Sequence, residues 1–136
     1  MGEAESIDIE ELKRGYAAIG RRDWDQVGAL YDPEIEWTDP PEIPGGGTHV
    51  GLEAVRASWE QYTEALEEWA LEPQEILHGT DDILVRSKVS GKARHTGIPI
   101  DLELYQVWTA RDGRLIRHRA FLDRNNALAA AGIEAA

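Results

Sequence analysis

The sequence predicts an α+β fold in which helices pack on one face of an antiparallel sheet, and two observations carry this prediction. Through the first half of the chain, apolar residues recur at steps of three and four, which is the period of an amphipathic helix. After Pro73 the period changes to two, which is typical of strands, and Asp112-Gly113 is a hairpin turn pair. The length of 136 residues suits one domain, so we expect a single domain over residues 1–136.

Two helices are predicted at the start of the chain. Residues 7–20 carry apolar side chains at helical spacing, and Ser6 or Asp8 can cap this helix. Asp23 is the expected cap of a short second helix, which Pro33 ends.

A short strand and the strongest helical signal follow. Residues 34–38 alternate as a strand does, and the Pro/Gly-rich residues 40–47 predict a loop. Apolar residues then repeat at steps of three and four over 18 residues, which predicts one long helix that Pro73 closes. Its aromatic-rich inner face consists of Leu52, Val55, Trp59, Tyr62, Leu66 and Trp69.

Four strands are predicted in the second half, at residues 75–79, 83–91, 100–111 and 114–123. The last two are joined by the tight turn at 111–114, and residues 90–97 form a looser connection. Residues 127–136 predict a short helix or a frayed tail.

Charge and composition exclude several classes of function. The net charge of −12 opposes binding to nucleic acids and to anionic lipid surfaces. The chain has no cysteine, which excludes disulfides and thiolate metal sites. No apolar run is long enough for a signal peptide or a membrane span, so we expect a cytoplasmic protein.

The four histidines do not suggest a metal site. No two of His49, His78, His95 and His118 show the spacing of metal ligands, so we expect no metal.

Segments that cover almost the whole chain resemble one known superfamily. The order and residue types are similar to the SnoaL-like (polyketide-cyclase-like) and ketosteroid-isomerase-like branch of the nuclear-transport-factor-2-like superfamily. The segments that carry the resemblance are "RRDWDQVGALYDPEIEWTDP" at 21–40, "HVGLEAVRASWEQY" at 49–62, "TGIPIDLELYQVWTARDGRLIRHRAFLDR" at 96–124 and "ALAAAGI" at 127–133.

The resemblance implies a cone-shaped fold, in which N-terminal helices pack inside a strongly curved, mostly antiparallel mixed sheet. It implies a mostly apolar pocket for a small hydrophobic molecule, chemistry without a cofactor, and a homodimer through the outer face of the sheet. Members of this superfamily include isomerases, cyclases, dehydratases and epoxide hydrolases, and the fold alone does not choose among them.

The strand at 101–109 has two candidate faces, because side chains alternate along a strand. Its even-numbered face (Leu102, Leu104, Gln106, Trp108) is the more apolar, and patterning alone would point it to the core. The resemblance implies the reverse. Counted back from the Asp112-Gly113 turn, the odd-numbered face (Asp101, Glu103, Tyr105, Val107, Thr109) would line the pocket, and a dimer partner would cover Leu102, Leu104 and Trp108. A one-residue bulge would reverse this assignment.

The same counting assigns the faces of two other strands. On the last strand, His118, Ala120 and Leu122 are expected to point inward with Ile116, whereas Arg117, Arg119 and Phe121 point outward. On the strand at 83–91, Ile83, Val85 and Ser87 are expected to point inward.

Asp39, in the segment Thr38-Asp39-Pro40, is similar in position to the catalytic aspartate of ketosteroid isomerases. By resemblance it would act as general base on a carbon next to a carbonyl. An apolar rim of Trp37, Trp59 and Tyr62 would raise the basicity of its carboxylate by desolvation. The alternative is that Asp39 only caps the Pro/Gly loop.

Such chemistry also needs donors for the enolate oxygen. The resemblance places the tyrosine of the first helix at Gly15, so Tyr16 is not a direct counterpart, and it places Tyr105 where the family has a second, acidic donor. A phenol can donate a hydrogen bond without an unusual pKa. His118 could pair with Glu103 as an acid/base dyad, or be held by a single hydrogen bond in the sheet.

We therefore expect a small-molecule protein, with Asp39, Tyr105 and His118 as catalytic candidates. The alternatives are a non-catalytic binding domain for a hydrophobic metabolite, and a dimerisation module. The candidate ligand-binding residues are Tyr16, Trp37, Trp59, Tyr62, Val85, Glu103, Val107, Ala120 and Leu122.

Overall fold

The computed structural model describes residues 8–42, 46–79 and 82–134, and they form four helices and a six-stranded mixed sheet that does not close into a barrel. Along the chain the elements are α2 (Ile9–Gly20), α3 (Trp24–Leu30), β1 (Tyr31–Asp39), β2 (Gly47–Val50), α4 (Leu52–Ala65), β3 (Leu66–His78), β4 (Asp82–Ala93), β5 (Pro99–Arg111), β6 (Arg114–Phe121) and α5 (Arg124–Ala131).

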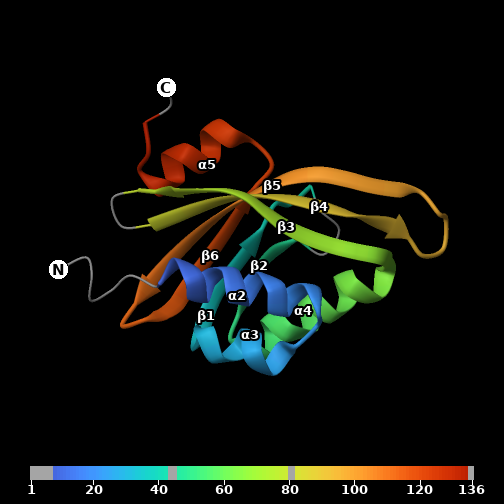
Figure 1. Cartoon of the computed structure of the whole chain (residues 1–136), viewed down its shortest axis with the longest axis horizontal. Coiled ribbons are helices and arrows are strands. Elements are labelled where there is room, and N and C mark those ends of the chain that lie inside the picture. Colours follow the sequence, from blue (N-terminus) through green and yellow to red (C-terminus); the bar gives the residue numbers. More distant parts are fainter. Residues whose placement is uncertain (1–7, 43–45, 80–81, 135–136) are drawn as a thin grey trace.

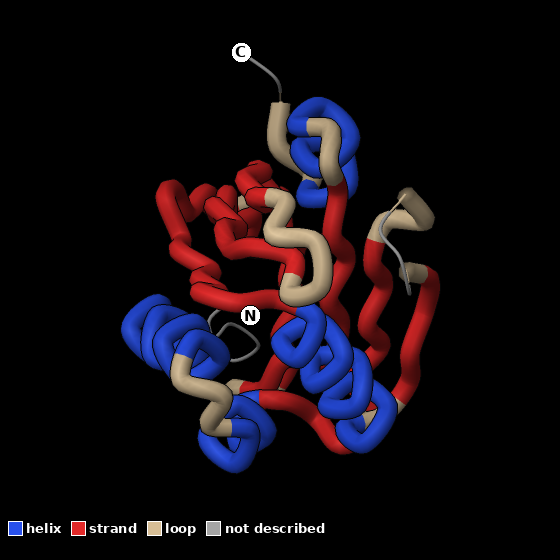
Figure 2. Tube along the Cα trace, turned by 90° about the vertical axis from the view of Figure 1, so that its right-hand side faces the viewer, coloured by secondary structure: helices blue, strands red, loops and turns tan. Residues whose placement is uncertain are grey.

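The sheet separates two groups of helices. Its strand order is β2-β1-β6-β5-β4-β3, and every neighbouring pair is antiparallel except β1 and β6. The helices α2, α3 and α4 lie on one face, and α5 lies on the other, as Figures 1 and 2 show. The predicted α+β class is confirmed.

The first two helices begin where the sequence predicts. The Asp8 carboxylate accepts a hydrogen bond from the Glu10 amide at 2.7 Å, and Asp23 accepts one from the Gln26 amide at 3.3 Å. The alternative cap, Ser6, lies outside the described residues. The second helix ends at Leu30, before Pro33, because the backbone is already extended at the next residue.

The third helix is shorter than predicted. It ends at Ala65, and the chain continues as the edge strand β3 from Leu66, so Trp69 is a strand residue. The start of β3 is kinked: Glu68 has a φ of 55°, and the register shifts between Glu67 and Ala70. Because of this kink, the apolar side chains at the start of β3 point inward at a spacing like that of a helix. Periodicity alone therefore extended the helix too far.

Two further elements differ from the prediction. Pro73 does not close a helix but lies inside β3, which is an edge strand where a missing N–H is tolerated. The end of the predicted loop at 40–47 begins a short strand, β2, which pairs with β1 and sets His49 opposite Trp37.

The prediction that the odd-numbered side chains of 101–109 line the interior is wrong. The even-numbered side chains Leu102, Leu104, Gln106 and Trp108 point toward the helices. The odd-numbered Tyr105 and Val107 instead pack against α5 on the outer face, with Leu84, Ala127, Leu128 and Ala131.

A bulge in β6 explains the error. Thr109 pairs with Arg117 and Ala110 pairs with Leu115, so Ile116 has no partner in the ladder. The bulge adds one residue to β6 but none to β5. A count through the turn that assumes equal numbers of residues in the two strands therefore assigns the β5 side chains beyond the bulge to the wrong face of the sheet. Because Trp108 then pairs with His118, these two side chains share the inner face.

The faces of the neighbouring strands agree with the prediction, except at Ile116 and Leu122. Ile116 is half-buried and outside the ladder, and Leu115 is the core residue at this point of β6. Ile83, Val85 and Ser87 point inward, as do His118 and Ala120. Leu122 does not: it follows the end of β6 and is 40% exposed.

The C-terminal segment is the helix α5, which belongs to the fold. Asp123 caps it by accepting from the Asn126 amide at 2.9 Å, and Gly132 ends it in the left-handed conformation at φ 72°. Arg119 ties it to the sheet, because its guanidinium donates to Asp82 at 2.9 Å and to the Ala130 carbonyl at 3.2 Å.

Beyond α5 the outer face of the sheet carries charged side chains. Arg86 lies between Glu75 and Glu103, at 3.3 and 3.2 Å. The apolar side chains that a dimer partner was expected to cover lie inside the molecule instead. A homodimer through this face stays a prediction, but the need to cover exposed apolar side chains of β5 no longer supports it.

The reversed face of β5 can be tested by stability. Replacing Leu104 with alanine removes a buried side chain and should lower the free energy of unfolding by about 2–5 kcal/mol. Asp101→Ala, on the exposed face, should change it by less than about 0.5 kcal/mol. Urea denaturation of both variants measures the difference, and equal effects would contradict the observed facing.

Candidate active site

The carboxylate of Asp39 is buried at the carboxyl end of β1. Burial alternates along this strand, so Ile35, Trp37 and Asp39 share its inner face, and Asp39 is only 7% exposed. The indole Nε1 of Trp37 donates a hydrogen bond to Asp39 Oδ2 at 3.1 Å. Pro40 and Pro41 follow and end the strand.

Burial makes Asp39 an unusually basic carboxylate. Desolvation raises its pKa from the ordinary 3.8 to about 6, while the hydrogen bond from Trp37 and the interaction with His49 pull in the opposite direction. A carboxyl group with this pKa changes charge near neutral pH, which suits a group that accepts and returns a proton.

The rim predicted from the sequence does gather around Asp39. The Trp59 ring meets the Trp37 ring edge-on, with centroids 5.5 Å apart and planes at 77°. Tyr62, three residues further along α4, is close enough that the charge of Asp39 adds to burial in raising the pKa of its phenol to about 12. Asp39, Trp37, Trp59 and Tyr62 therefore form one cluster, which we call the Asp39 cluster.

Several buried donors near this cluster have no hydrogen-bond partner among the described residues. They are Trp59 Nε1, Tyr62 Oη, Trp69 Nε1 and, on the ring that stacks on Trp37, His118 Nδ1. Trp69 adjoins the cluster, because its ring lies 5.9 Å from that of Trp59. It comes from β3, so the sequence prediction of one long helix could not place it here.

A second group of polar side chains, centred on Gln106, lies on the face of the sheet that α2, α3 and α4 cover. Tyr16 donates to Gln106 Oε1 at 2.6 Å and accepts from Trp108 Nε1 at 2.9 Å. Ser87 also donates to Gln106 Oε1, at 3.0 Å. The amide nitrogen of Gln106 therefore faces His118 Nε2, 3.0 Å away. The sequence signal for Gln106 was its place in the apolar even-numbered face of β5.

This network fixes the tautomer of His118. An amide nitrogen can only donate, so His118 Nε2 accepts and the ring proton lies on Nδ1. The side chain is completely buried, and its ring stacks on Trp37 with centroids 3.7 Å apart. Burial lowers the pKa of His118 from 6.5 to about 3, so the ring is neutral at neutral pH.

The acid/base dyad predicted between His118 and Glu103 is not formed. Glu103 lies on the outer face of β5, where it accepts a hydrogen bond from Tyr105 at 3.0 Å. Tyr105 and Val107 are on the same outer face, away from Asp39. Because of the β6 bulge, none of these three residues can join the cluster.

The remaining predicted ligand residues have other surroundings. The Tyr16 hydroxyl is engaged with Gln106 and Trp108. Val85 and Ala120 are buried in the core, as the two cross-strand neighbours of Gln106.

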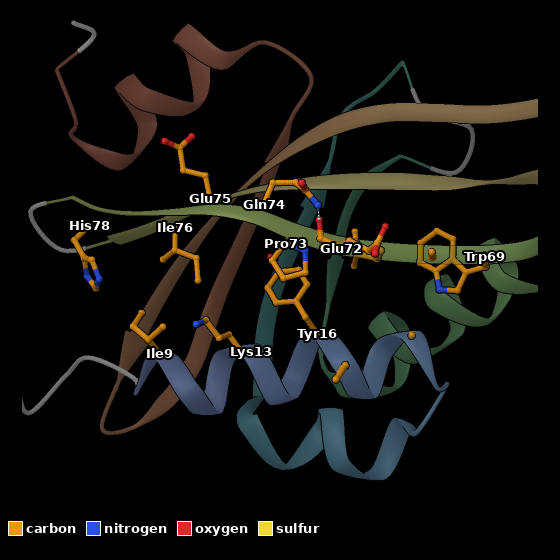
Figure 3. Close-up of a pocket in the computed structure, with 14 residues that line it drawn as sticks. Ile9, Lys13, Tyr16, Trp69, Glu72, Pro73, Gln74, Glu75, Ile76 and His78 are labelled. Atoms are coloured by element: carbon orange, nitrogen blue, oxygen red, sulfur yellow. Dashed lines mark hydrogen bonds between the residues drawn. The ribbon is translucent and has the colours of Figure 1, made fainter.

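A groove of about 970 Å³ runs between α2 and the edge strand β3. Figure 3 shows Ile9, Lys13 and Tyr16 of α2 pointing toward β3, with Trp69 at the end nearer α4. The groove reaches Trp69 but not Asp39, so the Asp39 cluster adjoins it through the Trp59–Trp69 contact. A smaller groove of about 230 Å³ between α3 and α4 reaches Trp59 from the other side.

Within residues 8–42, 46–79 and 82–134, no group of three histidine, aspartate or glutamate side chains is placed to hold a metal ion. None of the helices in the same ranges is long and apolar enough to cross a membrane.

The fold places the chain in the nuclear-transport-factor-2-like class. A structure of such a protein from Burkholderia xenovorans is 28% identical, with a TM-score of 0.72, covering 91% of this chain and 94% of that one. One from Burkholderia pseudomallei, of unknown function, is 25% identical, with a TM-score of 0.76, covering 89% and 94%.

Within this class the chain belongs to the SnoaL-like domain family, whose sequence pattern matches residues 12–118. It is also similar to the structure of a putative polyketide cyclase from Sinorhizobium meliloti, at 27% identity and a TM-score of 0.68, covering 82% of this chain and 94% of that one. A comparison with curated proteins gives no match.

The raised pKa of Asp39 predicts a stabilising substitution. A carboxyl that binds its proton more tightly in the folded state destabilises the fold as pH rises from about 4 to about 6. Asp39→Asn should therefore raise the free energy of unfolding at pH 7, by up to about 3 kcal/mol, with no gain below pH 4. Urea denaturation at both pH values measures this, and a loss of stability at pH 7 would contradict it.

The neutral state of His118 predicts a spectroscopic result. At pH 5 the folded protein should show a neutral His118 ring with its proton on Nδ1, because burial lowers the pKa to about 3. The ¹⁵N shifts of the labelled imidazole report both the charge and the tautomer, and the urea-denatured chain is the control. An imidazolium at pH 5 in the folded protein would contradict the prediction.

Proposed function

We propose that this protein is a small-molecule enzyme that uses Asp39 for proton transfer without a cofactor, in an isomerisation, cyclisation or dehydration. The observation that carries the proposal is the buried Asp39 carboxylate, with a pKa raised to about 6, inside an aromatic cluster. The likeness to a putative polyketide cyclase at 27% identity supports this class of chemistry.

In the proposed reaction, Asp39 removes a proton from a carbon next to a carbonyl and returns it to another atom of the ligand. The hydrogen bond from Trp37 leaves Oδ1 as the oxygen that accepts the proton, since Oδ2 already accepts the indole N–H. Trp37 is itself held between Trp59 and the stacked His118 ring, so the carboxylate is oriented by packed neighbours.

The ligand expected for this site is uncharged and largely apolar. The walls of the Asp39 cluster are aromatic, and the carboxylate together with the net charge of −12 disfavours anions. His118 takes no part as an acid or base, because it is neutral and fully buried. Its role is to position Trp37.

A non-catalytic binding protein is the second candidate, and one observation favours it. The aromatic rings of Tyr31, Trp37 and Trp108 pack together on the face of the sheet that the helices α2, α3 and α4 cover. The open volume of about 970 Å³ lies instead in the groove between α2 and β3, which Asp39 does not line. In a binding protein, Asp39→Asn would leave ligand affinity nearly unchanged and there would be no reaction to lose.

Proton transfer can be tested before the substrate is known. The protein is incubated in D₂O with small aryl ketones and enones, and ¹H NMR follows the exchange of protons next to the carbonyl. We expect enzyme-dependent exchange that falls below about pH 6 as Asp39 becomes protonated, and that Asp39→Asn lowers at least about a hundredfold.

The matched control is Asp25→Asn, which makes the same change at a side chain that is 98% exposed. It should leave exchange unaltered. Equal exchange in the wild type and Asp39→Asn would contradict the role of Asp39 as the base, and binding without exchange would favour the second candidate.

A further inference from the structure

Two buried donors of the Asp39 cluster lack an acceptor among the residues that the structure describes. They are Trp59 Nε1 and Tyr62 Oη. Trp59 is 7% exposed as a whole residue, so its indole N–H is well removed from water. Buried donors in native proteins are nearly always paired, which makes two open donors in one cluster a specific feature to explain.

Both donors belong to one side of the Asp39 cluster. Trp59 and Tyr62 are three residues apart on α4, so they lie on the same face of that helix. The Trp59 ring contacts the Trp37 ring that holds Asp39, and Tyr62 is near enough to Asp39 to feel its charge. The donors and the base are therefore neighbours, contributed by α4 and β1.

Among the described residues, Trp69 Nε1 and His118 Nδ1 also lack a partner, but neither belongs to the Asp39 cluster. Three other candidate donors are already engaged. The Tyr16 hydroxyl donates to Gln106, the Tyr105 hydroxyl donates to Glu103 on the outer face, and the Trp37 indole donates to Asp39. A ligand oxygen next to Asp39 can thus be met by Trp59 and Tyr62 without breaking a hydrogen bond of the protein.

We propose that Tyr62 and Trp59 together bind the carbonyl oxygen of the ligand and stabilise the negative charge that develops on it during proton transfer. This rests on the proposed function. The bond from carbon to hydrogen breaks and the proton passes to Asp39. The electron pair left behind forms a carbon–carbon double bond, and the carbonyl electrons move to the oxygen, which accepts from the two donors. Return of the proton to carbon restores the carboxylate.

The site therefore selects a neutral carbonyl compound with an apolar body. The oxygen is required because two donors await an acceptor, and the apolar body is required by the aromatic walls. Trp69, whose ring contacts Trp59, also lines the groove between α2 and β3, so the proposal places the ligand's way in at the Trp69 end of this groove.

The test uses two probes of one shape. Acetophenone carries the carbonyl oxygen, and α-methylstyrene has a CH₂ group in its place. The wild type should bind acetophenone about threefold to tenfold more tightly, which is the size expected of one or two neutral hydrogen bonds. Tyr62→Phe should remove most of this preference and leave the affinity for α-methylstyrene within twofold. Quenching of tryptophan fluorescence measures both affinities.

A spectroscopic readout separates hydrogen bonding from packing. With ¹³C-labelled acetophenone, the infrared carbonyl band should shift to lower frequency when bound to the wild type, and less so when bound to Tyr62→Phe or Trp59→Phe. The controls are Tyr105→Phe, which removes an engaged hydroxyl on the outer face, and Trp24→Phe, which lies on the other side of Trp59.

The outcomes distinguish this inference from the proposed function. A carbonyl shift that depends on Tyr62, without exchange in D₂O, supports the donor site and counts against catalysis by Asp39. Exchange that depends on Asp39 but not on Tyr62 or Trp59 overturns the donor site alone. Equal affinity for the two probes, no binding of either, or an unchanged band in both variants also overturns it.

Discussion

The packing of the sheet against α2 and the arrangement of the polar side chains between them depend on the side-chain amide of Gln106. It is 1% exposed and joins residues from three strands and one helix, because Tyr16 and Ser87 donate to its oxygen and its nitrogen faces His118. A buried amide is stable only when both of its ends are paired. This requirement fixes the inward face of β5, docks α2 on the sheet, and sets the tautomer of His118.

From His118 the constraint extends to Asp39. The neutral imidazole stacks on Trp37, and Trp37 in turn donates to the carboxylate. The chain of contacts that begins at Gln106 therefore reaches the end of β1 through the packed rings of His118 and Trp37. A carboxylate that is oriented in this way and deprived of water is more basic than one on the surface.

The sequence predicted the fold class, the helix caps and the Asp39 cluster, but not the whole site. Asp39 and its rim were predicted from the resemblance to ketosteroid isomerases, while strand alternation puts Trp37 on the face of Asp39 and helix spacing puts Tyr62 on the face of Trp59. The face of β5 could not be predicted, because it depends on a single unpaired residue, Ile116, in the neighbouring strand. Trp69 was missed for a related reason, since a kink at the start of β3 imitates a continued helix.

The described surroundings of Asp39 differ from those expected of a carboxylate that only caps a loop. A carboxylate that caps a loop is stabilised by backbone N–H groups and has a lowered pKa, whereas burial raises that of Asp39, and the described donor to it is an indole. Donors on Trp59 and Tyr62 that lack a partner in the described part of the chain add a second unfavourable feature at the same place. The buried carboxylate and the donors without a partner both weaken the folded state, and they lie on neighbouring elements. A ligand that gives a proton to Asp39 and an oxygen acceptor to Trp59 and Tyr62 would make both favourable. The proposed function would account for both features at once, which is the physical reason for placing the site at this corner of the fold.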